Sequence, residues 1–139
     1  NADIAWQDGS HPALSRLAQF WQDEIMDALL LLHPTVLATG YDGPGDYYST
    51  GDKGLIRRRD MNSAPYVFTG VQLLHPRLFK DTPDCPFPLT FLYDRAEANG
   101  RLFGLIHDGA WHHIGTPSGL AEAEEVFCGS NSLNEMSDV

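Results

Sequence analysis

The sequence has few basic residues, few cysteines and no long apolar run, and each shortage excludes a class of protein. It has 9 lysines and arginines against 19 aspartates and glutamates, giving a formal net charge of −10, so it lacks the basic face that nucleic-acid binding needs. Two cysteines, Cys85 and Cys128, are too few for a disulfide framework. The longest apolar block, Ala28 to Leu32, is far too short to cross a membrane as a helix. We therefore expect a cytoplasmic protein with reduced thiols and with neither a nucleic-acid nor a membrane partner.

What remains fits one ordinary globular domain. A chain of 139 residues corresponds to about one domain, and at this size it can bury roughly two-thirds of the surface that its unfolded form exposes. Helical spacing of apolar residues and capping signals predict helices over 10–21, 89–99 and 117–127. Short apolar runs bounded by turn residues predict strands over 26–34, 47–50, 55–58, 66–74, 101–107 and 110–114.

Two of these predictions shape the expected fold. The block over 26–34 could continue the first helix, but its unbroken apolar run, ended by Pro34, favours a buried strand. Asp108-Gly109 is a strong turn signal and predicts a hairpin between the strands on either side of it. Mixed helices and strands with crossover connections predict an α/β fold with a mixed, mostly parallel sheet.

The most informative stretch is a strand, a tight turn and a helix, with the sequence Trp111-His112-His113-Ile114-Gly115-Thr116-Pro117 at its start. Gly115 allows close approach of the backbone to another group. Thr116 is a good N-cap and Pro117 suits the first helical position. Because ligands of α/β proteins bind where a strand leads into a helix, and because histidines titrate or bind metals, this junction is a candidate site.

Three segments together resemble a known family. They are Asn1-Ala2-Asp3-Ile4, Tyr66-Val67-Phe68-Thr69-Gly70-Val71 and Gly109-Ala110-Trp111-His112-His113-Ile114-Gly115-Thr116-Pro117. In this order they resemble the carboxyl-terminal half of the sugar-phosphate nucleotidyltransferases, in the branch of mannose-1-phosphate guanylyltransferase and N-acetylmuramate-1-phosphate uridylyltransferase. The resemblance spans nearly the whole chain, and the last segment is its most specific part.

The resemblance implies a reaction, a cofactor and a set of site residues. A nucleoside triphosphate and a sugar 1-phosphate would form a nucleotide sugar and pyrophosphate, with Mg²⁺ or another divalent cation as the main electrophile. Asp3 matches one metal-binding aspartate of the family, and His113 stands where the family has the second. Gly45, Thr69 and Gly70 would line the sugar. Arg59 belongs to the basic cluster Arg57-Arg58-Arg59 and would contact phosphate.

The sequence also departs from the family's pattern. Imidazole suits softer metals better than Mg²⁺, so His113 alters the expected cation site. The glycine-rich signature that holds the triphosphate is absent from these 139 residues, and so is a Glu-Lys-Pro after the hairpin. We therefore expect residues 1–139 to be the carboxyl-terminal, sugar-phosphate-binding part of a Rossmann-like nucleotide-diphospho-sugar transferase domain. Without the nucleotide-binding half, this part would be inactive on its own.

Other interpretations stay open. A non-catalytic sugar-phosphate-binding or regulatory module on the same fold would also explain the replaced aspartate. A zinc-dependent hydrolase would need His107, His112 and His113 to converge, although the alternation of a strand turns His112 away from His113. Thr69-Gly70 and Gly45 could serve packing alone, and the arginine cluster could be a solvated edge. An exposed sheet edge in a half-domain would allow association into a homo-oligomer.

Overall fold

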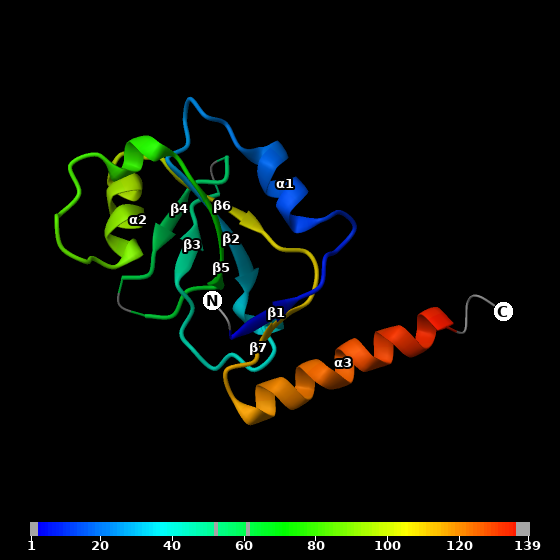
Figure 1. Cartoon of the computed structure of the whole chain (residues 1–139). Coiled ribbons are helices and arrows are strands. Elements are labelled where there is room, and N and C mark those ends of the chain that lie inside the picture. The colour runs from blue at the N-terminus through cyan, green and yellow to red at the C-terminus, as the bar shows by residue number, and fades with distance from the viewer. Residues whose placement is uncertain (1–2, 52, 61, 136–139) are drawn as a thin grey trace.

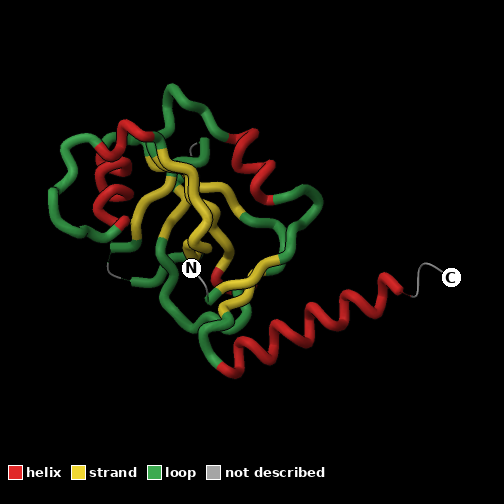
Figure 2. Tube along the Cα trace, viewed as in Figure 1, coloured by secondary structure: helices red, strands yellow, loops and turns green. Residues whose placement is uncertain are grey.

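The computed structural model describes residues 3–51, 53–60 and 62–135, and it combines a five-stranded sheet with a separate two-stranded ribbon (Figures 1 and 2). Asn1 and Ala2, which begin the first segment of the family resemblance, lie outside the described residues. The elements in chain order are β1 (Ile4–Trp6), α1 (Ala13–Phe20), β2 (Ala28–Pro34), η1 (Thr35–Leu37), β3 (Tyr47–Ser49), β4 (Ile56–Arg58), β5 (Tyr66–Leu74), η2 (Pro76–Phe79), α2 (Leu89–Ala98), β6 (Leu102–Ile106), β7 (Trp111–His113) and α3 (Pro117–Glu135).

Strand β2 forms the core of the molecule and confirms the prediction of a buried strand over this block. Its residues from Ala28 to His33 are all buried. Successive side chains of a strand point to opposite faces, so Leu30 and Leu32 pack with α2 while Leu29 and Leu31 pack with α1. The sheet is therefore covered by a helix on each face, and this explains why β2 has no polar side until His33.

The mixed α/β fold is confirmed, with more antiparallel pairing than expected. The strand order is β4-β3-β5-β2-β6. Strands β2 and β6 pair in parallel, whereas β5 pairs antiparallel with both β2 and β3, and β3 pairs antiparallel with β4. The connection from β3 to β4 is too short for the crossover that a parallel pair requires, so this part of the sheet folds back on itself.

The hairpin predicted at Asp108-Gly109 is wrong. The turn joins β6 to β7, but β6 pairs with β2 while β7 pairs with β1. The chain changes sheets here because Gly109 packs directly on the segment after β1, where a Cβ at this position would lie 1.9 Å from the Gln7 carbonyl oxygen. The Gln7 N–H also donates to the Ala110 carbonyl at 2.9 Å, which extends the pairing of β1 with the returning strand.

Two helices differ in length from their predictions. Helix α1 begins at Ala13 and ends at Phe20, with the Asp8 carboxylate accepting a hydrogen bond from the Ala13 N–H at 2.9 Å. Helix α3 continues to Glu135 rather than ending at residue 127, and in Figure 1 it leads away from the rest of the molecule. In the part of the chain that the structure describes, no helix is both long and apolar enough to span a membrane.

Candidate functional site

Asp3 and His113 meet at one end of the two-stranded ribbon. Asp3 directly precedes β1, and Ile4 at the start of that strand pairs with His113 at the end of β7. The Asp3 Oδ2 and the His113 Nε2 are 3.4 Å apart, and the two side chains are 49% and 30% exposed. The Ile114 N–H also donates to the Asp3 carbonyl at 2.8 Å. The structure thus brings together the two residues that the family resemblance assigned to a cation, and leaves both open to solvent.

Glycines hold the main chain close to this pair. A Cβ on Gly115 would lie 2.9 Å from the His113 ring and 3.3 Å from the Asp3 side chain. A Cβ on Gly40 would lie 2.6 Å from the His113 carbonyl oxygen, and one on Gly119 would lie 2.2 Å from the same atom. Any side chain at these three positions would displace His113, so the glycines fix where the imidazole stands. Gly40 and Gly119 were not singled out from the sequence.

The turn after His113 starts α3 as predicted. The Thr116 hydroxyl accepts a hydrogen bond from the Gly119 N–H at 3.1 Å, as an N-cap side chain does. Pro117 then occupies the first position of the helix. The rigid start of α3 holds Gly115 and Gly119 against the Asp3–His113 pair.

The donors of this pair suit a divalent cation only in part. The pair offers one carboxylate oxygen and one imidazole nitrogen, and the described residues contain no group of three or more histidine, cysteine, aspartate or glutamate side chains that could hold a metal ion. Because Mg²⁺ is usually held by one or two carboxylates together with water and substrate phosphates, Asp3 fits that role. The three-histidine zinc site is not formed.

The other histidines near the ribbon are buried. His112 turns away from His113, and its ring lies 5.6 Å from the ring of Phe127. His33 and His107 lie with ring centroids 5.7 Å apart at the joint between the ribbon and the main sheet. Burial lowers the pKa of both His33 and His112. These side chains fill the interior beneath the ribbon and do not face the Asp3–His113 pair.

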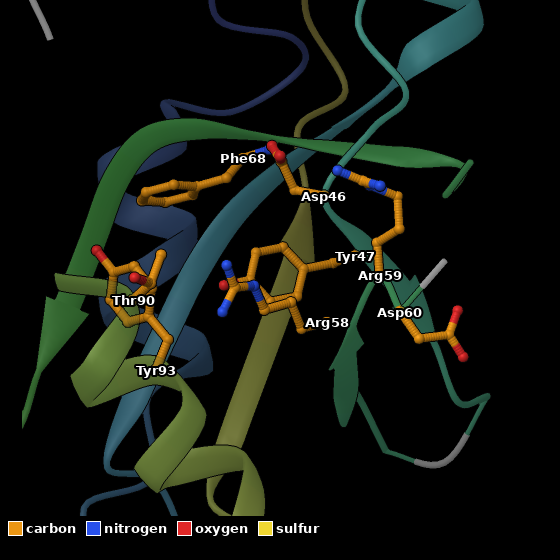
Figure 3. Close-up of a pocket in the computed structure, with 8 residues that line it drawn as sticks. All are labelled: Asp46, Tyr47, Arg58, Arg59, Asp60, Phe68, Thr90 and Tyr93. Atoms are coloured by element: carbon orange, nitrogen blue, oxygen red, sulfur yellow. The ribbon is translucent and has the colours of Figure 1, made fainter. Parts of the chain in front are cut away.

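A pocket of about 500 Å³ opens between the sheet and α2 (Figure 3). Phe68, Tyr47 and Tyr93 form apolar walls, and the rings of Phe68 and Tyr93 meet edge to face at 5.6 Å. Tyr47 and Tyr93 are each only 3% exposed. The full lining consists of Asp46, Tyr47, Arg58, Arg59, Asp60, Phe68, Thr90 and Tyr93. The pocket therefore has flat apolar walls and a charged rim.

Arg59, predicted to contact phosphate, lines this pocket. Its Nε donates to the Gly45 carbonyl at 2.9 Å, and its Nη1 donates to the Asn62 carbonyl at 3.2 Å. Among the described residues no carboxylate lies within ion-pair distance of Arg59, whereas Arg57 pairs with Asp60 and Arg58 with Asp94. Within the described part of the chain, Arg59 is therefore held by carbonyl oxygens and has no carboxylate partner.

Gly45 supports the pocket through its backbone. Its φ is +78°, a conformation that favours glycine, and a Cβ there would lie 2.0 Å from the Ala64 carbonyl oxygen. The next residue, Asp46, accepts a hydrogen bond from the Phe68 N–H at 2.8 Å. Gly45 therefore lets the chain turn tightly enough for Asp46 to hold Phe68 in the pocket wall.

Thr69 and Gly70 lie in β5 next to Phe68 but are not among the lining residues. Thr69 is buried, and its hydroxyl donates to the Leu31 carbonyl of the neighbouring strand at 2.8 Å. Gly70 has a φ of +91° and lies where the pairing of β5 with β2 shifts register. The irregular pairing bends β5 beside the pocket.

One loop connects the pocket with the Asp3–His113 pair. At its start the Thr39 carbonyl accepts a hydrogen bond from the His113 N–H at 2.9 Å. In the middle of the loop the Tyr41 hydroxyl accepts one from the Gly45 N–H at 3.0 Å. Burial raises the pKa of Tyr41, which keeps this hydroxyl neutral. Residues 39–46 thus link the two parts of the candidate site through hydrogen bonds of the main chain and of the Tyr41 hydroxyl.

Of the eight residues that line the pocket, the sequence assigned only Arg59 to the site. Asp46 and Phe68 stand directly beside the predicted Gly45 and Thr69, so the neighbours of those residues carried the signal. Thr90 and Tyr93 come from α2, whose sequence pattern indicates only a helix packed on a sheet. Their place in the pocket follows from how α2 lies on the sheet.

Comparison with known proteins adds to this geometry. No protein-family model matches the chain. The chain is 36% identical over 125 residues to N-acetylmuramate alpha-1-phosphate uridylyltransferase from Caulobacter vibrioides, a match that covers 89% of this chain and 51% of that protein. A crystal structure from Bacillus anthracis, assigned as a glucose-1-phosphate thymidylyltransferase in complex with a sucrose, is similar in fold with a TM-score of 0.60 at 17% identity.

The match to that structure covers 89% of this chain and 51% of the other. The chain therefore spans about half the length of each of these proteins. The match at 36% identity confirms the resemblance inferred from the three sequence segments, and the structural match confirms the fold.

Proposed function

We propose that this chain is part of a sugar-phosphate nucleotidyltransferase, since it matches one such protein at 36% identity over 51% of that protein's length, and that it provides the sugar-phosphate side of the family's reaction. In that reaction a nucleoside triphosphate and a sugar 1-phosphate form a nucleotide sugar and pyrophosphate. One observation carries the proposal: the loop over 39–46 joins the Asp3–His113 pair to a pocket lined by Arg59, which has no carboxylate partner among the described residues. Both parts lie at positions that the resemblance assigns to substrate and cation.

The residues of the chain would bind and orient the sugar phosphate. Arg59, held by two main-chain carbonyls, would neutralise phosphate charge. The rings of Tyr47, Phe68 and Tyr93 would exclude water from the sugar. Alignment of two polyanions and neutralisation of their charge are the main needs of phosphoryl and nucleotidyl transfer, and these groups serve both.

A divalent cation would be held by Asp3, with His113 as its neighbour. When bound there it would supply positive charge to the reacting phosphates. Mg²⁺ takes oxygen ligands by preference, so Asp3 would provide its protein ligand, and His113 would suit a softer ion such as Mn²⁺ or Zn²⁺ better. His113 therefore changes which cation this position favours.

Calorimetric titration of the chain with a sugar 1-phosphate tests the binding role. Arg59→Gln should weaken binding about tenfold, the effect of losing one charge-assisted contact. Arg57→Gln is the matched control, because Arg57 is an exposed neighbour that pairs with Asp60 and stacks on the Tyr48 ring. Equal affinities for the wild type and Arg59→Gln would remove Arg59 from the site.

Catalysis needs a separate assay. We expect no pyrophosphate from the chain incubated with a nucleoside triphosphate, a sugar 1-phosphate and Mg²⁺, because the glycine-rich triphosphate signature is absent from its 139 residues. Pyrophosphate release by the purified chain would overturn this expectation.

The replaced aspartate favours a second candidate, a sugar-phosphate-binding module without catalysis. The two candidates predict different results for His113→Asp in the longest form of the protein that the gene encodes. An enzyme should gain Mg²⁺-dependent turnover, since a second carboxylate suits Mg²⁺. A binding module should show no turnover with either residue.

A further inference from the structure

The pocket has a second cationic group with a different environment from Arg59. Arg58 ends β4, and its Nη1 lies 2.7 Å from the Asp94 Oδ2 of α2. In Figure 3 its guanidinium lies between the Tyr47 ring and Thr90, whereas Arg59 lies on the other side of Tyr47. The pocket thus holds one arginine at each end, with aromatic walls between them.

Helix α2 contacts Arg58 through two carboxylates, one at the main chain of Arg58 and one at its guanidinium. The Glu97 carboxylate accepts a hydrogen bond from the Arg58 main-chain N–H, which anchors α2 to β4. The Asp94 carboxylate contacts only the guanidinium, and both side chains of this pair are 47% exposed. An ion pair that is half exposed contributes little to stability, so Arg58 can exchange Asp94 for another carboxylate at small cost.

From this arrangement we infer that Arg58 selects sugar 1-phosphates that carry a second anionic group, a carboxylate on the sugar, which takes the place of Asp94 on the guanidinium. This inference rests on the proposed function, because it assigns the phosphate to Arg59. Arginine binds carboxylates in a planar, two-pronged geometry, and the Asp94 contact already shows this guanidinium holding a carboxylate at the pocket.

The chemistry of the related uridylyltransferase agrees with this assignment. As its name states, that enzyme acts on the 1-phosphate of N-acetylmuramate, an amino sugar that bears a carboxylate on a lactyl ether. The pocket volume of about 500 Å³ leaves room for such a substituent beside the sugar ring.

The test compares two ligands that differ only in the lactyl group. The chain is titrated calorimetrically with N-acetylmuramate 1-phosphate and with N-acetylglucosamine 1-phosphate. We expect the acid to bind at least about tenfold more tightly, as for one charge-assisted arginine contact. Arg58→Gln should abolish this preference, because it should weaken the binding of the acid at least about tenfold more than the binding of N-acetylglucosamine 1-phosphate.

Asp94→Asn is the more stringent test, because it should raise the affinity for the acid, whereas Arg58→Gln should lower it. Without the competing carboxylate, Arg58 is free for the ligand, and the affinity for the acid should rise severalfold. Glu97→Gln is the matched control, since it removes the same charge from the same helix but contacts only the main chain of Arg58. Equal increases in affinity for the acid in Asp94→Asn and Glu97→Gln would show that only the overall charge of the protein matters, and would overturn the inference.

Each outcome bears on a distinct claim. Equal affinity of the wild type for both sugar phosphates would overturn the role of Arg58 and leave the proposed function standing. Failure of both ligands to bind would overturn the proposed function itself. If Arg58→Gln does not fold, the wild-type preference and the gain in Asp94→Asn decide the matter.

Discussion

The pocket and the Asp3–His113 pair belong to regions that are stabilised in different ways. The pocket walls come from β3, β4, β5 and α2, and their rings continue into a core that includes Leu30 and Leu32. The pair sits on a ribbon of two three-residue strands, and isolated two-stranded ribbons are marginal. Side-chain packing therefore sets the pocket, whereas glycine contacts and main-chain hydrogen bonds set the pair. Substitutions should affect the two regions separately.

The largest expected effect is a loss of stability when a side chain of the core beneath the pocket is shortened. Leu30→Ala should lower the free energy of unfolding by about 3 kcal/mol, because Leu30 is fully buried and its removal leaves a cavity. Ile4→Ala in the half-buried ribbon should cost about 1 kcal/mol. Urea denaturation of both variants measures the difference, and equal losses would show that the ribbon is as firmly packed as the core.

The next effect concerns the turn that supports the pocket. Gly45→Ala should lower the free energy of unfolding by about 2 kcal/mol, since it combines a positive φ with a collision against the Ala64 carbonyl. Gly51→Ala is the matched control, because Gly51 has a φ of +75° but a Cβ there would have no described atom within 4 Å apart from its neighbours in the chain. It should cost about 1 kcal/mol. If the two variants melt alike, the close approach to Ala64 is not a constraint.

Low pH should lower the stability of the protein through His33, which is buried between the two regions. Burial holds the pKa of His33 below its ordinary value of 6.5, so the unfolded chain binds more protons as the pH falls below that value. The stability contributed by neutral His33 is thus complete above pH 6.5 and is lost as the pH falls through the lowered pKa, with a slope of up to about 1.4 kcal/mol per pH unit for one proton.

Urea midpoints measured between pH 7.5 and pH 5 test this dependence. His33→Phe keeps a ring of similar size and removes the titrating group, so its stability should depend less on pH over this range. A variant with the same acid sensitivity as the wild type would assign the effect to other groups.

The smallest effect lies at the start of α3. Thr116→Ala removes the side chain that caps the Gly119 N–H and should cost about 1 kcal/mol. Because α3 contacts the rest of the molecule mainly at β7, hydrogen exchange should increase in the first turn of α3 and near His113, and stay unchanged around the pocket. Faster exchange in α2 would show that the two regions are coupled.

Local patterns predicted the parts of the fold that depend on local chemistry. The apolar run of β2, the short strands β3 and β4, and the Thr116 cap were all identified. The meeting of Asp3 with His113 followed from the family resemblance, since nothing local links residues 110 positions apart. The hairpin at Asp108-Gly109 was wrong because a turn signal does not determine which strands pair.

Tyr93 shows why the pocket could not be predicted in full. The sequence predicts a helix over 89–99, and Tyr93 is a buried residue of that helix. Whether that ring also borders a cavity depends on how far β3 and β5 diverge, and β3 pairs with β5 only at Tyr47 and Tyr66. That divergence is a long-range property of the sheet, and short windows of sequence do not contain it.

A crystal structure of the chain with a sugar 1-phosphate and Mn²⁺ tests the central claim most directly. The account predicts the sugar against the rings of Tyr47, Phe68 and Tyr93, with its phosphate on Arg59 and the cation on Asp3. A sugar phosphate bound elsewhere, with the pocket filled only by solvent, would contradict it.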